Sequence, residues 1–172
     1  MNEILLLYVL SKGQSTMYGL SKQIQKYFGF LTSPSFGTIQ PTMKKFEKNK
    51  LITTKKFFTE GGKPYFSYLI TDEGVSYLKD KLNTFADKNP IKLYPKIKIS
   101  LICSDILNEE EKNQLYKKIK TELLKLKKGS ETLLKSETFN ENSRGRLILD
   151  TTVCEYNNML DLVERFDNAG SC

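Results

Sequence analysis

The balance of lysine against acidic residues is uneven along this sequence, and the ammonium group of lysine binds phosphate oxygens. Between positions 12 and 63 the sequence has ten lysines and two acidic residues, Glu47 and Glu60. The whole chain of 172 residues has a net charge of +7, and residues 1–89 contribute +6 of it. A polyanion that binds such a segment releases its counterions, which favours nucleic acid as the partner. The alternative is an ordinary solvated surface rich in lysine.

Residues for catalysis or metal binding are scarce. The chain has no histidine, which excludes Ser-His-Asp and Cys-His nucleophiles and histidine-bearing zinc sites. Its three cysteines, Cys103, Cys154 and Cys172, form no close pair and match no thiolate metal spacing. The acidic run 109–111 is typical of a helix start. We therefore expect no enzyme, no metal and no cofactor, while a redox-sensing thiol stays open.

Three short helices are predicted in the first fifty residues. The first covers the apolar run 4–10, and the second begins at Thr16 as N-cap and ends near Phe28, because apolar residues recur there at spacings of three and four. The third begins at Ser35, a few residues before Pro41, where a missing N–H costs little. The third helix should bury Ile39, Met43 and Phe46 and expose Gln40, Lys44, Lys45 and Lys48.

A two-stranded hairpin and a fourth helix should follow. Residues 51–58 and 65–70 are rich in β-branched and aromatic side chains, and a glycine-containing loop separates them. Thr71 is the expected N-cap of the next helix. Three helices followed by a hairpin are typical of a winged helix-turn-helix, in which the third helix enters the major groove and the hairpin reaches the backbone or minor groove.

Three segments resemble the PadR family of transcriptional regulators. Residues 17–19 (Met-Tyr-Gly) are similar to the family's His/Tyr-Gly opening, residues 35–52 resemble its Ser-x-Gly-Thr-Ile-Tyr-Pro helix, and residues 61–74 resemble its wing tip, second strand and Glu-Gly helix start. The chain departs from the pattern with Gln40 in place of Tyr and with Asn49-Lys50 where a glycine usually ends the helix. Because a glutamine amide can both donate to and accept from adenine, Gln40 is a candidate base-reading residue.

The second half of the chain predicts long helices. Asn108 and Glu111 have the spacing of a capping box. Residues 97–101 alternate like a strand, whereas the family resemblance implies a helix there. Apolar residues further on form a heptad seam made of Leu149, Val153, Tyr156, Leu160 and Val163. The resemblance implies that the C-terminal helices, together with the first helix, form a homodimer.

The predicted fold is mainly α with a two-stranded β wing, divided into a winged helix-turn-helix domain (1–89) and a helical dimerisation domain (90–172). The expected DNA contacts are Tyr18, Ser35, Thr38, Gln40, Lys44, Lys45, Lys48, Lys55, Lys56 and Lys63. For several of these a structural role is the alternative, as helix caps, polar filler or protection of a strand edge. Tyr68 is expected to pack the wing onto the helices.

The favoured hypothesis is a cytoplasmic, homodimeric repressor that binds a pseudo-palindromic operator in double-stranded DNA. The alternative is a winged-helix module that binds another protein. The resemblance also implies a small-molecule effector near the dimer interface, but no residue identifies it. The apolar run 4–10 is too short to span a membrane, and we expect no membrane association.

Overall fold

The computed structural model describes residues 2–32, 35–85, 89–136 and 144–169. It has two compact units, Met1–Ile106 and Leu107–Cys172, which are described separately. Helices and one two-stranded antiparallel sheet make up the regular structure, so the predicted fold class is confirmed. The boundary between the compact units does not test the predicted division by function into residues 1–89 and 90–172, which stays a prediction.

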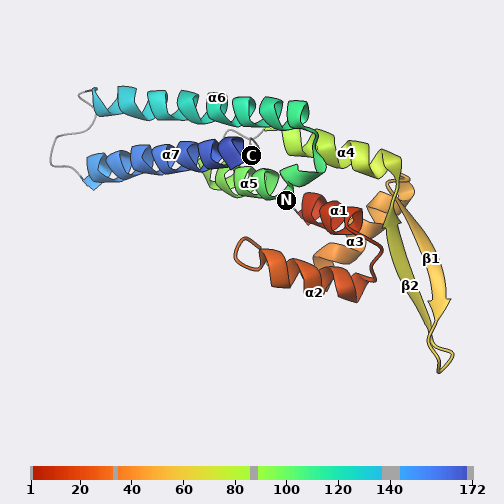
Figure 1. Cartoon of the computed structure of the whole chain (residues 1–172). Coiled ribbons are helices and arrows are strands. Elements are labelled where there is room, and N and C mark those ends of the chain that lie inside the picture. Colours follow the sequence, from red (N-terminus) through yellow and green to blue (C-terminus); the bar gives the residue numbers. More distant parts are fainter. Residues whose placement is uncertain (1, 33–34, 86–88, 137–143, 170–172) are drawn as a thin grey trace. The chain divides into compact units, whose positions relative to one another are not determined.

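The first unit is built around the apolar helix α1. Ile4, Leu5, Leu6 and Leu7 are buried in succession, which occurs when neighbours surround a helix; α2, α3, α4 and β2 all pack against α1. The elements of the unit, drawn in Figure 1, are α1 (Asn2–Ser11), α2 (Met17–Phe28), α3 (Phe36–Lys48), β1 (Ile52–Phe58), β2 (Pro64–Ile70), α4 (Asp72–Asn83), α5 (Pro90–Ile102) and the 3-10 helix η1 (Cys103–Ile106).

The helix starts lie at the predicted residues. Thr16 and Thr71 accept hydrogen bonds at their side-chain oxygens from the backbone N–H groups of Gly19 and Gly74, each at 3.0 Å. Ser35 occupies the N-cap position of α3 with an extended backbone, but its side chain makes no capping bond. Its carbonyl instead accepts the Thr38 hydroxyl at 2.8 Å. Ser35 therefore occupies the predicted start of the helix without a side-chain cap.

Helix α3 ends in a left-handed residue that is not glycine. Lys50 has φ of +58°, and its N–H donates to the Glu47 carbonyl while the Leu51 N–H donates to the Phe46 carbonyl. This is the Schellman pattern, in which glycine is the usual left-handed residue. The first turn of α4 packs closely against the residue that ends this motif, because a Cβ on Gly74 would lie 2.1 Å from the Leu51 carbonyl oxygen. The chain therefore ends α3 in a Schellman motif with a lysine at the position where glycine is usual.

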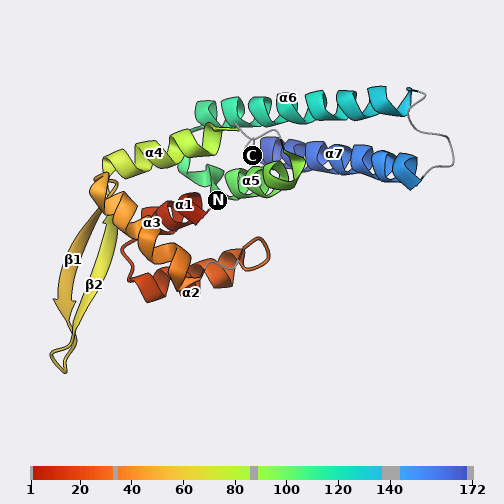
Figure 2. The ribbon, with the colours of Figure 1, turned by 180° about the vertical axis from the view of Figure 1, so that it is seen from behind.

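The hairpin matches the predicted wing. Strands β1 and β2 pair antiparallel from Ile52 opposite Ile70 to Phe58 opposite Pro64, and both views show them extending away from the helices of the first unit (Figures 1 and 2). Tyr68 is half-buried and exchanges backbone hydrogen bonds with Ser15 at 2.9 and 3.1 Å. As predicted, Tyr68 lies where the wing joins the helices.

Residues 97–101 lie in helix α5, so the strand alternative was wrong. Ile97, Ile99 and Leu101 are all buried, although residues two apart point in very different directions on a helix. Ser100, between them, is buried too and donates to the Leu82 carbonyl at 3.1 Å. Burial on more than one side of α5 therefore produced an alternation that imitates a strand.

The second unit is a pair of long helices, α6 (Glu109–Leu134) and α7 (Arg144–Ala169), which pack against each other. Asn108 and Glu111 form the predicted capping box. The Lys120 ammonium donates to the Asp167 carboxylate at 2.8 Å and so joins the two helices. Within the described ranges, every helix is too short or too polar to cross a membrane.

Candidate nucleic-acid interface

Helix α3 presents a polar face because its apolar stripe is fully anchored. Ile39, Met43 and Phe46 are buried, whereas Gln40, Lys44 and Lys48 on other sides of the helix are exposed. Pro41 lies five residues after the helix start; its ring cannot donate to the carbonyl of residue 37, which lies in the exposed first turn. The start of α3 therefore offers exposed polar side chains on a firmly packed helix.

The three predicted lysines of α3 differ in their partners. The Lys45 ammonium donates to the Glu3 carboxylate of α1 at 2.6 Å, and the Tyr77 hydroxyl of α4 donates to the same carboxylate at 3.1 Å. Among the residues that the structure describes, no ion pair engages Lys44 or Lys48. The structure thus leaves two lysines of the helix available to a phosphate and ties the third to α1.

The electrostatics of the Glu3 cluster agree with this arrangement. Partial burial works to raise the pKa of the Glu3 carboxyl, but the bonds from Lys45 and Tyr77 outweigh it, and the pKa lies below its usual value. The same bond and the charge of Glu3 raise the pKa of Lys45. Both groups are therefore ionised at neutral pH. Sequence reasoning missed this cluster, because Glu3 and Tyr77 lie far from α3 in the chain.

The polar residues at the start of α3 are exposed but not equally available. The hydroxyl of Thr38 already donates to the Ser35 carbonyl, while Ser35 and Gln40 have exposed side chains with no such bond in the described part of the chain. Tyr18 of α2 is 61% exposed, and the Lys22 ammonium lies 5.6 Å from the centre of its ring. Tyr18 is thus exposed beside a cation.

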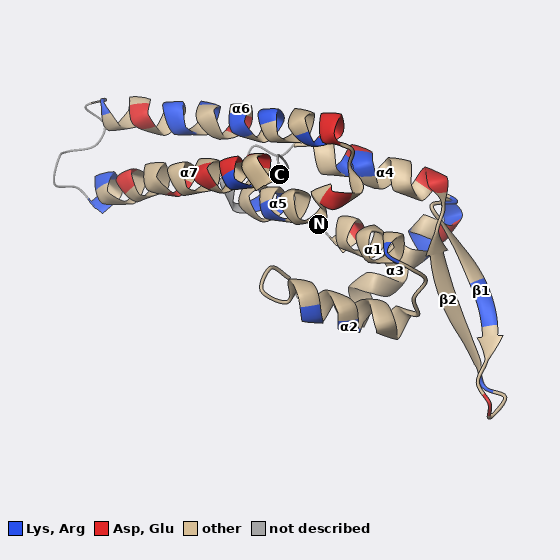
Figure 3. Ribbon diagram, viewed as in Figure 1, with Lys and Arg blue, Asp and Glu red and all other residues tan. Residues whose placement is uncertain are grey.

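The wing carries the other predicted lysines. Lys55 and Lys56 lie on β1 and Lys63 lies in the tip, all with exposed side chains; Figure 3 shows the basic residues of β1 in blue. The Thr54 hydroxyl donates to the Glu47 carboxylate of α3, which links the base of the wing to the helix. Glu47, one of the two acidic residues in this segment, is therefore engaged inside the unit.

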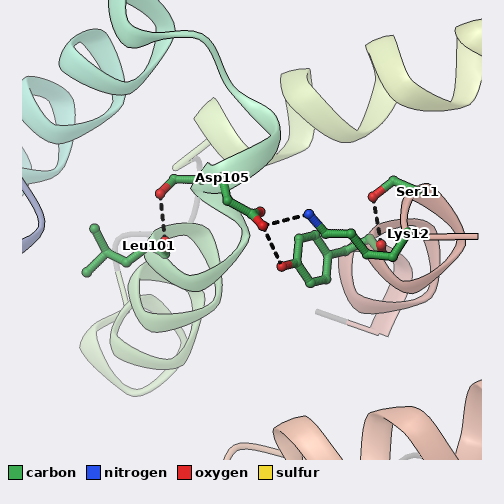
Figure 4. A network of polar contacts seen from close by, with 6 residues as sticks. Ser11, Lys12, Leu101 and Asp105 are labelled. Atoms are coloured by element: carbon green, nitrogen blue, oxygen red, sulfur yellow. Dashed lines mark hydrogen bonds and ion pairs between the residues drawn. The ribbon is translucent and has the colours of Figure 1, made fainter. Parts of the chain in front are cut away.

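Lys12 belongs to the basic segment but has a structural partner. Its ammonium donates to the Asp105 carboxylate of η1 at 2.6 Å, and the Tyr8 hydroxyl donates to the same oxygen at 3.1 Å (Figure 4). Burial, assisted by the negative charge of Asp105, raises the pKa of Tyr8 well above its usual value. This network joins α1 to η1. Within the described part of the chain, Lys12 is thus held by a partner in η1, unlike Lys44 and Lys48 of α3 and the exposed lysines of the wing.

A cavity of about 480 Å³ opens beside this network, between α1, α2 and α5. Tyr8, Tyr27 and Phe28 contribute aromatic rings to its wall, and Lys12 contributes an ammonium group. Its volume falls within the usual range for small-molecule sites. Among the described residues, no group of three His, Cys, Asp or Glu side chains could hold a metal ion.

The predicted dimerisation seam is only partly covered within the chain. Tyr156 and Val163 are buried, while Leu149, Val153 and Leu160 are half-buried. Leu147 and Ile148, at the start of α7, are each 67% exposed. Of the cysteines, Cys103 is buried and Cys154 is exposed, and Cys172 lies outside the described residues. Burial raises the pKa of the Cys103 thiol to about 12, which makes it unreactive as a nucleophile.

The comparisons with known proteins agree with this geometry. The model of the transcriptional regulator PadR-like family matches residues 6–80. A PadR-like transcriptional regulator from Bacillus cereus is 32% identical over 45% of this chain and 74% of its own, with a TM-score of 0.39. A transcriptional regulator from Clostridium thermocellum is 30% identical over 46% of this chain and 76% of its own, with a TM-score of 0.43.

A third solved structure is similar over almost the full length. Bacillus subtilis PadR in complex with operator DNA is 19% identical, covers 97% of both chains and has a TM-score of 0.46. No curated protein matches the chain. The family match covers the helices and the wing that carry the exposed lysines, and the identities to the two regulators extend over three quarters of their lengths. The chain therefore belongs to the transcriptional regulator PadR-like family.

Proposed function

We propose that the protein is a homodimeric repressor that binds a pseudo-palindromic operator through α3 and the wing. The observation that carries this proposal is the pair of exposed lysines, Lys44 and Lys48, on the same helix as the exposed amide of Gln40. Lysines that meet phosphates position a helix on DNA, and an amide at its N-terminal half reads bases in the major groove. Lys55, Lys56 and Lys63 extend the basic surface along the wing.

The second copy of the chain in the dimer provides the α3 helix that binds the second half-site of the operator. Leu149, Val153 and Leu160 keep part of their surface exposed on α7, as expected of a seam that a second copy covers. A two-fold dimer places two copies of α3 about 34–36 Å apart, one helical turn of DNA. Replacing Val153 and Leu160 together by glutamate should leave a monomer in analytical ultracentrifugation. If that variant stays dimeric, the seam is not the interface.

The first experiment is a binding titration on the DNA upstream of the protein's own gene, with scrambled DNA of equal length as competitor. We expect a preference for the upstream DNA and a loss of that preference in Gln40→Ala, because base contacts discriminate sequences by about 1–3 kcal/mol each. Lys44→Ala should weaken binding to both DNAs alike. Absence of any preferred upstream site in the wild-type protein would contradict the proposal.

The protein-interaction alternative makes an opposite prediction about salt. Each phosphate contact contributes about −0.9 to the slope of log affinity against log salt concentration. Binding through α3 and the wing therefore falls steeply as salt rises. A protein partner held by apolar contacts would bind with little salt dependence.

The proposal includes an effector bound in the cavity between α1, α2 and α5. Its aromatic wall favours planar aromatic compounds. Such a compound should raise the melting temperature and weaken operator binding, because a ligand shifts an equilibrium only by binding the two states unequally. Tyr27→Ala should reduce both effects.

A further inference from the structure

The outer half of the wing is unusually aromatic for a hairpin in water. Phe58 is 63% exposed, Phe66 is 50% exposed and Tyr65 is 40% exposed. Three large, partly apolar side chains therefore lie at the end of a two-stranded ribbon that extends away from the helices (Figures 1 and 2). Large apolar side chains exposed together on one short element are a candidate contact site for another molecule.

The strand register divides these rings between two faces. Paired residues in an antiparallel ribbon share a face, so Lys56 with Phe66 and Phe58 with Pro64 lie on one side. Phe57 and Tyr65 pair on the opposite side, where their rings stack at 5.6 Å with an interplanar angle of 21°. The stacked pair stiffens the ribbon. Phe58 and Phe66 have no stacking partner among the described residues and present their rings outward.

Positive charge surrounds these two rings. The Lys56 ammonium lies 5.1 Å from the centre of the Phe58 ring, and Lys63 lies in the adjoining tip. Lys55 pairs with Ser67 and so lies on the opposite face. Strand β2 itself has no charged residue (Figure 3), and the tip adds a single acidic residue, Glu60. The wing thus combines apolar rings with ammonium groups. A DNA minor groove has the complementary chemistry, because flat base pairs lie between two rows of phosphates.

We propose that Phe58 and Phe66 form an aromatic wedge that enters the minor groove, partly unstacks one base step and bends the operator. The inference rests on the proposed DNA-binding function and adds a deformation of the DNA to it. Lys56, on the face of the wedge, and Lys63, in the tip, hold the flanking phosphates, and the Phe57–Tyr65 stack supports the ribbon from behind. Apolar side chains inserted between base steps kink a duplex by 20–90° and favour flexible pyrimidine–purine steps.

The test uses the full chain and the preferred upstream DNA, labelled at both ends for energy transfer and carrying 2-aminopurine at successive positions of the minor-groove contact. We expect wild-type protein to shorten the end-to-end distance and to raise 2-aminopurine emission at one step. The double variant Phe58→Ala with Phe66→Ala should lose both changes and about tenfold in affinity, consistent with about 1–3 kcal/mol for a stacked base. Phe30→Ala, which removes a ring that is 75% exposed outside the wing, is the control and should leave both changes intact.

A second variant makes the result independent of any loss of affinity. The chain has no tryptophan, so Phe58→Trp introduces a single indole at the wedge. Its emission should be quenched on binding the operator, because the indole stacks on bases, and poly-anionic heparin should not produce that quenching. Both rings are exposed, so we expect the far-UV circular dichroism of all variants to match the wild type.

Three outcomes separate the possibilities. The wedge is supported if the double alanine variant loses both the bending and the rise in 2-aminopurine emission while Phe30→Ala keeps both. Wild-type DNA that stays straight, or a double variant that still bends it, overturns the wedge while operator binding stands. A wild-type protein that prefers no DNA overturns the proposed function and the wedge together, and the rings would then serve a protein partner.

Discussion

Lysines in the two units of the molecule have different surroundings. In α6 the ammonium groups of Lys112, Lys125 and Lys127 pair with glutamates three or four residues away, and Lys120 pairs across to α7. On α3 and the wing, the residues Lys44, Lys48, Lys55 and Lys56 form no ion pair within the described ranges. Figure 3 shows blue and red interspersed along α6 and α7, whereas β1 has a blue band and no red.

The paired lysines of α6 are already neutralised by a carboxylate, whereas the lysines of α3 and the wing that form no ion pair with a described residue can bind a phosphate. A lysine paired on its own helix stabilises that helix by about 0.3–0.5 kcal/mol and has little left to offer a phosphate. An unpaired lysine in a one-sided segment repels its neighbours, and a polyanion relieves that repulsion. Local pairing, and not the number of lysines, therefore distinguishes the proposed DNA surface from the helical pair.

The largest expected effect comes from neutralising the available lysines of α3. Lys44→Gln with Lys48→Gln should lower operator affinity more than tenfold near physiological salt and reduce the salt slope by about 1.8, since each phosphate contact contributes about 0.9. The measurement is a set of binding isotherms at several salt concentrations. Lys112→Gln with Lys125→Gln removes the same charge from paired lysines of α6 and should change the slope little. Equal effects of the two pairs would refute the comparison.

The sequence predicted the elements of the first unit well, because the local chemistry of that unit agrees with its fold. Threonine caps at positions 16 and 71, the apolar stripe of α3 and the glycine-containing hairpin tip each specify their element from a few neighbouring residues. Helix α5 was ambiguous because it is buried on more than one side. Burial of that kind depends on neighbours that periodicity does not reveal.

The candidate site was less predictable than the fold. The sequence indicated which lysines lie on α3 but not that Glu3 holds Lys45, since that pair joins residues 42 positions apart. It likewise gave no hint that Lys12 binds Asp105, 93 positions away. Spacing within one helix is set by local geometry, whereas partners on other helices are set by tertiary packing. The predicted DNA contacts as a whole remain predictions.

The Glu3 cluster offers a second test, because Lys45 is on α3, like the lysines that have no ion pair among the described residues, but is paired with a carboxylate, like the lysines of α6. Glu3→Gln removes the carboxylate charge and should release the Lys45 ammonium, which raises operator affinity a few-fold and the salt slope by up to about 0.9. Lys45→Gln in the wild-type background should leave the slope nearly unchanged. A slope that falls as much in Lys45→Gln as in Lys44→Gln would mean that Lys45 contacts phosphate despite its bond to Glu3.

Lys96 represents a third class, a lysine that is half-buried in the first unit. Burial lowers the pKa of its ammonium to about 8, although Cys103 and Asp80 act in the opposite direction. The ammonium donates to the Lys81 carbonyl near the end of α4. Because the folded pKa lies below the unfolded value, the unfolded chain binds more protons above pH 8. The free energy of unfolding should therefore rise with pH from about 8 to about 10.5.

Cys103 limits the pH range over which this test is useful. Its raised pKa, about 12, makes stability fall as pH rises above the ordinary thiol value near 9. Between about pH 7 and about pH 9, the contribution of Lys96 to urea unfolding outweighs the smaller opposing contribution of Cys103, with a net gain of about 1 kcal/mol. The gain should vanish in Lys96→Met and persist in Lys98→Met, which changes an exposed lysine of the same helix. A pH dependence that survives Lys96→Met would assign it to another group.

The smallest effect concerns Lys50, whose charge and backbone have opposite consequences. Its φ of +58° is strained for a residue with a Cβ, so Lys50→Gly should increase the free energy of unfolding by up to about 1 kcal/mol. Asn49→Gly is the matched control: Asn49 has φ of −88°, so glycine there gains nothing and should destabilise through added freedom of the unfolded chain. If Lys50 also meets a phosphate, Lys50→Gly lowers the salt slope by about 0.9 while the protein becomes more stable. Stability and DNA affinity that move in opposite directions in this one variant would place Lys50 with the available lysines, whereas an unchanged slope would leave only its backbone role.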